Sequence, residues 1–256
     1  MNTQLREKIG EIIGTINKES ILNEQGCTSE VSKIITDSGS YLLKNSYNKR
    51  YREWLKKEAL VLEKLKYNNL IQVPNYYGYI EEKASSHLIM SFEEGITLTS
   101  ALNQAENTTE KKELIRSFGY FLHQFHQTSI METLNQDTDW LKEQLVEAGR
   151  YVNDGQTDGS LQLLEKLQST KLLPVQQTMI HGDCTTDNVL VVAGRVRLFI
   201  DVSAMTVGDP RYDESLAIRG FADNAFLKQS FYEGYTRYKV SEEEFTYFEA
   251  GLYEFF

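Results

Sequence analysis

The chain has 256 residues, 41% hydrophobic and 25% charged, which is typical of a globular protein long enough to bury a core. Acidic residues outnumber basic ones by 37 to 27, for a formal net charge of -10. This balance argues against a sequence-independent nucleic-acid binder, which needs a basic face, and against docking on anionic lipid.

Two further features concern the compartment. No apolar stretch approaches the roughly 18 residues that a membrane span requires, and the first residues lack the basic start and apolar run of a signal peptide. Cys27 and Cys184 are too few for a disulfide framework. We therefore expect a cytoplasmic protein that binds neither nucleic acid nor membrane.

The first ninety residues predict short strands around one helix. The strand candidates are short, rich in β-branched or aromatic residues and bounded by turn residues. They cover Ser20–Leu22, Val31–Thr36, Ser40–Lys44, Tyr76–Glu81 and His87–Phe92.

An amphipathic helix is predicted over residues 49–66, where apolar side chains from Tyr51 to Leu65 recur at three- and four-residue steps. Glu58 occupies one position of the same stripe. A buried carboxylate is costly unless it is paired, so Glu58 is expected to have a partner, most simply a cation. The alternative is that Glu58 lies at the edge of the stripe and stays in water.

After Gly95 the pattern becomes mainly helical. Helices are predicted around residues 114–125, 140–146 and 161–167 and in the aromatic-rich tail from 213 to 256, with a β-hairpin at 189–192 and 196–200. Strands first and helices later predict an α+β fold in two lobes, residues 1–93 and 94–256.

The segment from Met179 to Leu190 carries the most informative polar residues. Asp183 is followed five residues later by Asn188, and Asp201 comes thirteen residues after that. Asn188 and Asp201 bracket the short hairpin, whose ends can approach each other, and both offer the hard oxygen ligands that Mg²⁺ takes. Asp183, in the preceding loop, is placed to orient and deprotonate a hydroxyl. The alternative is a turn with local Asx hydrogen bonds.

An Asp, an Asn five residues later and a downstream metal-binding Asp are the parts of the protein-kinase template. Here the motifs are His181-Gly182-Asp183 and Asp201-Val202-Ser203. Together with the run from Gly208 to Asp213, this order resembles the aminoglycoside phosphotransferase family. That family is the small-molecule branch of the kinase-like superfamily, which also holds choline kinases. The resemblance implies a bilobal kinase-like fold, with a small antiparallel N-lobe sheet, one helix and a larger helical C-lobe.

The resemblance also implies a nucleotide site in residues 1–93. Lys44 would contact the α- and β-phosphates of ATP, with Glu58 as its helix partner. The Thr28 and Ser29 hydroxyls, in the loop from Gly26 to Val31, would approach the phosphates. GTP stays open as an alternative donor, and the loop also fits a plain surface hairpin.

The base would lie at the linker between the lobes. Backbone groups of Ser91 and Glu93 would bind adenine, and Met90 would line the base pocket. Tyr41 or Leu42 would cover the ring; only one can, because neighbouring strand residues point to opposite faces.

The resemblance makes Asp183 the catalytic residue and makes Asn188 and Asp201 the Mg²⁺ ligands. Arginine is absent before Asp183, and only seven residues separate Asp201 from Asp209. A long activation loop does not fit there, which disfavours a protein kinase and favours a small hydroxylated acceptor.

The acceptor is less constrained. The tail from Ser241 to Phe256 holds five acids and no base. In similar aminoglycoside 3′-type members, a tail Glu and the terminal carboxylate bind the cationic sugar, so Glu254 and the Phe256 carboxylate are expected to bind a substrate amine. A solvated, packed aromatic tail is the alternative. Ala204 stands where some resistance enzymes carry an arginine, which weakens the case for 3′-specificity.

Three functional alternatives therefore stay open. They are an aminoglycoside kinase that confers antibiotic resistance, a metabolic kinase for choline, homoserine or a sugar amine, and a catalytically silent nucleotide-binding protein. A monomer and a homodimer both fit the sequence.

Overall fold

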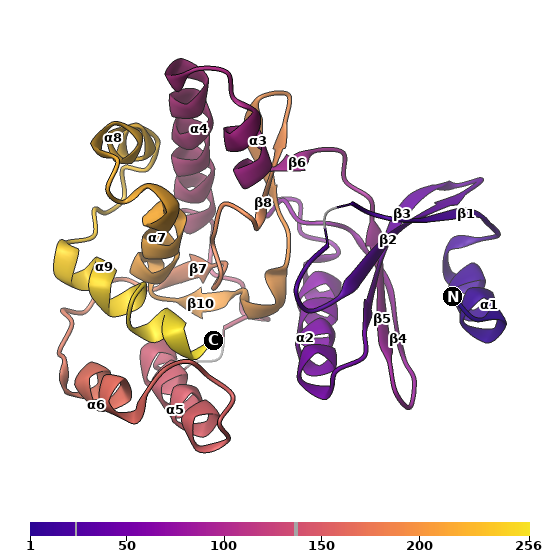
Figure 1. The fold of residues 1–256 in the computed structure, drawn as a ribbon, viewed down its shortest axis with the longest axis horizontal. Helices are drawn as coiled ribbons and strands as arrows, with labels where there is room; N and C mark the ends of the chain where they lie inside the picture. The colour runs from indigo at the N-terminus through magenta and orange to yellow at the C-terminus, as the bar shows by residue number, and fades with distance from the viewer. Residues whose placement is uncertain (24, 136–137) are drawn as a thin grey trace. The chain divides into compact units, whose positions relative to one another are not determined.

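The computed structural model describes residues 1–23, 25–135 and 138–256. The chain forms two compact units (Figure 1). The first contains Met1–Glu94 together with Ile200–Ala204, and the second contains Gly95–Phe199 and Met205–Phe256. The change of unit after Glu94 lies one residue from the predicted boundary, and the short return of Ile200–Ala204 to the first unit was not predicted. The functions assigned to the two lobes stay predictions.

The first unit is built on a five-stranded antiparallel sheet in the order β1-β2-β3-β5-β4. Its strands are β1 (Ile16–Ile21), β2 (Glu30–Thr36), β3 (Gly39–Ser46), β4 (Tyr76–Glu81) and β5 (Ser86–Ser91). All five overlap predicted strands, and β1 begins four residues earlier than expected.

Two helices cover opposite sides of this sheet (Figure 1). The predicted helix is α2 (Lys49–Leu65), whose first turn is capped by the Asn48 side chain. The other helix, α1 (Thr3–Ile13), was not expected. The sequence predicted one helix in this unit, and the structure shows α1 in addition to α2. It buries Leu5, Ile9 and Ile13 against the sheet.

Strand register decides which side chains share a face. Leu43 on β3 and Ile89 on β5 are partners in the α1-side core, together with Tyr41. Since successive residues alternate, Leu42 and Lys44 lie on the opposite face, which α2 covers.

The second unit is mainly helical. Its helices are α3 (Leu98–Gln104), α4 (Thr108–His126), α5 (Trp140–Asn153), α6 (Leu161–Ser169), α7 (Pro210–Ile218), α8 (Ala225–Gly234) and α9 (Glu242–Phe248). One core of this unit joins Trp140 of α5, Tyr212 and Leu216 of α7, and Phe248 of α9. The predicted α+β class is confirmed.

Short strands complete the second unit. They are β6 (Ile96–Thr97), β7 (Thr178–Ile180), β8 (Val189–Val192), β9 (Arg195–Phe199) and β10 (Thr206–Gly208). The unit also contains the 3-10 helices η2 (Arg219–Phe221) and η3 (Leu252–Phe255). β8 and β9 form the predicted hairpin, whose turn residues Ala193 and Gly194 have φ of 49° and 74°. Positive φ at both central residues is the type I′ signature, which matches the twist of the paired strands.

Candidate active site

The buried carboxylate of Glu58 is paired with a cation. Glu58 is 3% exposed on the inward side of α2, and its two oxygens lie 2.8 and 2.9 Å from Lys44 Nζ. The backbone N–H of Val202 also donates to this carboxylate. The predicted partner of Glu58 is therefore present, on the sheet face that α2 covers.

Asp201 approaches the same ammonium group. Its Oδ1 atom lies 3.4 Å from Lys44 Nζ, and 46% of its side chain is exposed. The residue has φ of 59°, a conformation that non-glycine residues seldom adopt and that aspartate tolerates better than most. The 3-10 helix η1 (Val202–Ala204) begins directly after it.

These contacts set the charge of Lys44. Burial alone would lower the pKa of Lys44, but the carboxylates of Asp201 and Glu58 more than offset it and raise that pKa. Burial raises the pKa of Glu58, while the Lys44 ammonium opposes that rise. Lys44 therefore stays cationic and can balance anionic groups such as phosphates.

In the second unit, the loop that carries Asp183 is held by a buried carboxylate on α7. Asp213 accepts hydrogen bonds from the backbone N–H groups of His181 and Gly182 at 2.6 and 2.8 Å. Its Oδ2 also lies 3.3 Å from Nε2 of the buried His126, whose other ring nitrogen contacts the Tyr235 hydroxyl. A buried network thus fixes the backbone that leads into Asp183.

Neutral side chains donate to both oxygens of the half-buried Asp183 carboxylate. Asn188 Nδ2 donates to Oδ2 at 2.8 Å, and the Tyr253 hydroxyl donates to Oδ1 at 3.2 Å. Asn188 also binds the Asp183 carbonyl at 2.9 Å. Because the amide nitrogen of Asn188 is engaged in this way, its amide oxygen is the atom left to offer a cation.

His181 lies inside the loop. It is fully buried, its ring packs on Phe199 with centroids 5.0 Å apart, and its Nδ1 accepts the Asp183 backbone N–H at 3.2 Å. Packing and hydrogen bonding thus tie the His181 ring into the loop that carries Asp183.

Asn188 in the second unit and Asp201 in the first each carry the oxygen donors that Mg²⁺ takes, and their role as its ligands stays a prediction. Mg²⁺ in phosphoryl-transfer sites is usually held by one or two protein oxygens together with substrate phosphates. Within the described ranges, no three His, Cys, Asp or Glu side chains come together as a metal site of their own.

Comparison with known proteins identifies the family. The sequence model of the phosphotransferase enzyme family (APH) matches residues 21–244. The chain belongs to this family. It is thus a phosphotransferase enzyme, and the predicted family resemblance is confirmed.

Solved phosphotransferase structures share its fold. An aminoglycoside-3′-phosphotransferase of type VIII is 19% identical, with a TM-score of 0.76 and 93% of each chain covered. The spectinomycin phosphotransferase APH(9)-Ia, bound to ADP and spectinomycin, is 18% identical, with a TM-score of 0.63 over 97% of this chain and 83% of its own. A thermostable variant of APH(4)-Ia, bound to ADP and hygromycin B, is 18% identical, with a TM-score of 0.65 over 89% of this chain and 80% of its own.

These likenesses confirm the kinase-like fold and leave the acceptor of this phosphotransferase unassigned. No curated protein is similar enough in sequence to match it. Among the described helices of the enzyme, none is both long and apolar enough to cross a membrane.

Tyr41 requires a correction. Its ring is 7% exposed and packs in the α1-side core, edge-on to Tyr77. It therefore lies on the sheet face opposite Lys44 and is not placed to cover a base near that lysine. Leu42, the alternative, is on the face of Lys44, across the strand pair from the buried Met90.

The predicted linker contacts involve Ser91 and Glu93. The Ser91 backbone N–H donates to the Asn75 carbonyl at 2.9 Å. The Ser91 hydroxyl accepts from the Asn75 N–H and donates to the Glu93 carboxylate. Adenine contacts at Ser91, Glu93 and Met90 stay predictions.

The loop after β1 contributes to an open hollow. Thr28 and Ser29 line it together with Gln25, Tyr47 and Tyr51. Ser46 holds this loop, because its hydroxyl donates to the Thr28 carbonyl at 2.9 Å and lies 2.6 Å from the Ser29 hydroxyl. Phosphate contacts by Thr28 and Ser29 stay predictions.

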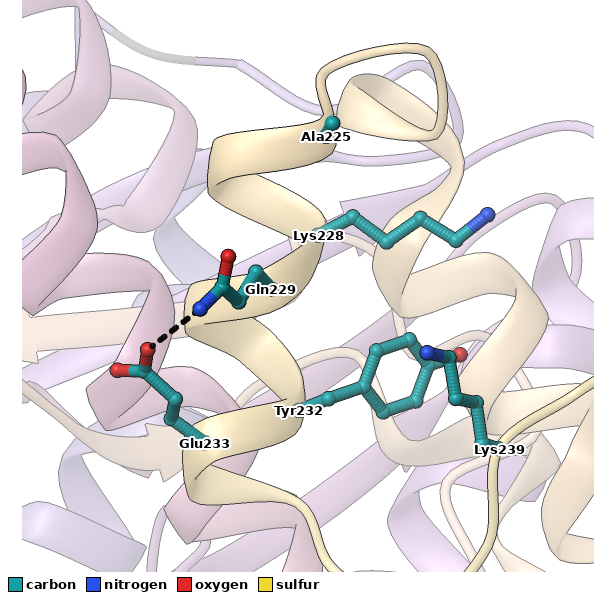
Figure 2. Close-up of a pocket in the computed structure, with 6 residues that line it drawn as sticks. All are labelled: Ala225, Lys228, Gln229, Tyr232, Glu233 and Lys239. Carbon is teal, nitrogen blue, oxygen red and sulfur yellow. Dashed lines mark hydrogen bonds between the residues drawn. The ribbon is translucent and has the colours of Figure 1, made fainter.

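A second hollow lies along α8 (Figure 2). Its lining contains none of the predicted site residues: Ala225, Lys228, Gln229, Tyr232, Glu233 and Lys239.

The tail residues divide between surface and core. Glu254 is exposed, and Phe256 is 37% exposed with its ring edge-on to Tyr151. Amine binding by Glu254 and Phe256 stays a prediction. The tail also supplies Tyr253 to Asp183, a contact that sequence analysis missed because no periodic pattern links two positions 70 residues apart.

Proposed function

We propose that this phosphotransferase transfers the γ-phosphoryl group of ATP to a hydroxyl of a small molecule that carries an amine, such as an aminoglycoside. The observation that carries the proposal is the environment of Asp183. Its carboxylate is half-buried in a loop clamped by Asp213 and receives neutral donors from Asn188 and Tyr253. A carboxylate held by neutral donors stays an acceptor for the proton of an incoming hydroxyl.

Phosphoryl transfer depends mainly on positioning and charge neutralisation. In this proposal Lys44, kept cationic by Glu58 and Asp201, binds the α- and β-phosphates. The oxygens of Asn188 and Asp201 would hold Mg²⁺, which would neutralise charge on the phosphate oxygens. Asp183 orients the acceptor hydroxyl and takes its proton late in the transfer, as the new O–P bond forms.

ATP as the donor is supported by relatives of the same fold whose structures contain ADP, and an amine-bearing acceptor by those that contain spectinomycin and hygromycin B. The exposed Glu254 in an acidic tail is compatible with a cationic acceptor, which Glu254 and Phe256 would bind. We place the reaction in the cytoplasm, because two cysteines are too few for a disulfide framework. The identity of the acceptor would distinguish a role in antibiotic resistance from a metabolic role.

A coupled ADP-release screen tests the proposal. The acceptors are aminoglycosides, spectinomycin, choline, homoserine and matched sugar pairs with and without an amine, such as glucosamine and glucose. We expect Mg²⁺-dependent ADP release with an amine-bearing acceptor and a phosphate monoester in the ³¹P NMR spectrum of the product. ATP binding without turnover of any acceptor would instead support a silent nucleotide-binding protein.

A further inference from the structure

The Tyr253 hydroxyl makes a specific contact with the proposed catalytic carboxylate. It lies 3.2 Å from Asp183 Oδ1, while Asn188 Nδ2 lies 2.8 Å from Asp183 Oδ2. Each carboxylate oxygen thus has its own donor. Two donors on different oxygens restrict rotation of a carboxylate about its terminal bond, which a single donor does not.

The Tyr253 hydroxyl is protonated near neutral pH and can therefore donate a hydrogen bond. Burial raises the pKa of Tyr253 to about 12, and the negative charge of Asp183 adds to the rise. The phenol therefore keeps its proton near neutral pH and donates it to Asp183.

The segment that carries Tyr253 is fixed on both sides. Leu252 and Phe255 are at most 1% exposed, in the core of the second unit. The Glu254 carbonyl accepts hydrogen bonds from the Gly159 N–H at 3.0 Å and from the Thr157 hydroxyl at 2.8 Å. The backbone that carries the Tyr253 phenol is consequently fixed by two buried neighbouring side chains and by hydrogen bonds to the Glu254 carbonyl.

The ring itself is also held. The Arg219 guanidinium lies 4.6 Å from the ring centroid, and Arg219 Nε is 3.3 Å from a Glu249 oxygen. A cation over the ring face stabilises this orientation of the phenol, and Glu249 balances its charge. Removal of the hydroxyl alone would leave the ring and the Arg219 cation over its face in place, and would remove the hydrogen bonds of the hydroxyl with Asp183 and Arg219.

We propose that Tyr253 is a positioning residue for Asp183: its hydroxyl fixes the carboxylate so that an oxygen is aimed at the acceptor hydroxyl. The proposal rests on the proposed function, because it assumes that Asp183 receives the acceptor proton. It extends that function by assigning a role to a residue of the C-terminal tail.

Tyr253→Phe tests the proposal, with Tyr247→Phe as the matched control. The Tyr247 hydroxyl donates to the Leu167 carbonyl at 3.3 Å, so both variants lose tyrosine hydrogen bonding in the same region, and only Tyr253→Phe loses a contact with Asp183. We expect kcat for acceptor phosphorylation to fall about 10-fold in Tyr253→Phe, with the KM for ATP within about 2-fold of wild type. Tyr247→Phe is expected to keep the wild-type kcat.

An unchanged or higher kcat in Tyr253→Phe would overturn the proposal, since a phenol that only competes with the acceptor for Asp183 would raise activity when removed. An equal fall in both variants would overturn it as well, because the effect would then be structural. Failure of the proposed function has a different signature: the wild-type enzyme itself would phosphorylate none of the acceptors.

A stability measurement tests the contact without any acceptor. Tyr253→Phe, Asp183→Asn and the double variant form a double-mutant cycle on the unfolding equilibrium constant in urea. We expect the combined effect to depart from the product of the single effects by about 3-fold or more, as for residues in direct contact. Independent effects would show that the hydroxyl does not hold the carboxylate.

Discussion

The two units hold their buried glutamates in different ways. In the first unit, Glu58 is 3% exposed and lies 2.8 Å from the Lys44 ammonium. In the second, Glu214 on α7 is fully buried, and its Oε1 accepts from the Val240 N–H at 2.7 Å and the Tyr232 hydroxyl at 2.8 Å. Glu214 Oε2 is buried with no hydrogen-bond partner among the described residues.

The two carboxylates with proposed roles, Asp201 and Asp183, follow the same division. Asp201 lies 3.4 Å from the Lys44 cation, while Asp183 receives neutral donors from Asn188 and Tyr253. A neighbouring cation pairs with the charge of a carboxylate, whereas neutral donors orient a carboxylate and leave its charge unpaired by a cation. The first unit is thus suited to charge balance, and the second to accepting a proton.

The largest effect is expected from removal of the cation. Lys44→Met leaves the buried Glu58 uncompensated and should lower the free energy of unfolding by about 3–5 kcal/mol. Glu58→Gln should cost less, because Lys44 keeps Asp201 as a partner. Urea unfolding followed by circular dichroism measures both.

Lys56→Met on the same helix is the control, since Lys56 and its partner Glu81 are about half exposed at 53% and 50%. It should change stability little. Equal losses in Lys44→Met and Lys56→Met would show that the Lys44–Glu58 pair is not a buried pair in solution.

A smaller, pH-dependent effect is expected at Glu214. Burial raises the pKa of Glu214 from 4.5 to about 7, so the folded state binds its proton more tightly than the unfolded state does. Its stabilising contribution is complete below about pH 4.5 and is lost as the pH rises through about 7. Glu214→Gln removes this dependence. Relative to wild type, its free energy of unfolding should rise by about 3 kcal/mol as the pH increases from 4.5 to 8.

The gain is measured from urea unfolding at a series of pH values. Tyr232, which donates to Glu214, stays in place in this variant and lies on α8 beside the hollow of Figure 2. The exposed Glu243→Gln serves as the control with no expected pH-dependent gain. A constant difference between Glu214→Gln and wild type across the pH range would mean that a cation or water compensates Glu214.

The smallest effect concerns the hairpin between Asn188 and Asp201. Gly194 has φ of +74° with open space around an added Cβ, so Gly194→Ala should cost about 1 kcal/mol through backbone strain alone. Gly10→Ala, in the interior of α1 with equally open space, should instead gain about 0.5–1 kcal/mol. Thermal unfolding compares them, and the same sign in both would contradict the type I′ turn.

The sequence predicted what local patterns encode. The helical stripe with a carboxylate at position 58 predicted both α2 and a cationic partner for Glu58. The alternating strands predicted the sheet. Helix α1 also had a signal, because Leu5, Ile9 and Ile13 recur every four residues behind the capping Asn2, but it was not recognised.

Other features depend on contacts between distant segments. The Tyr253 contact with Asp183 joins residues 70 positions apart, and the His126 contact with Asp213 joins residues 87 apart. No periodicity marks such pairs, because tertiary packing brings them together. Tyr41 and Leu42 stayed alternatives for the base contact, since the sequence alone could not tell which face of β3 would meet α1.

The most direct test compares Asp183→Asn with Asp201→Asn, each for turnover and for Mg²⁺-dependent ATP affinity. The exposed Asp187→Asn, from the loop of Asp183, is the control. We predict that Asp183→Asn loses about 1,000-fold or more in kcat and keeps its ATP affinity, while Asp201→Asn loses the Mg²⁺ dependence of ATP binding. Near-wild-type turnover in Asp183→Asn would contradict the account.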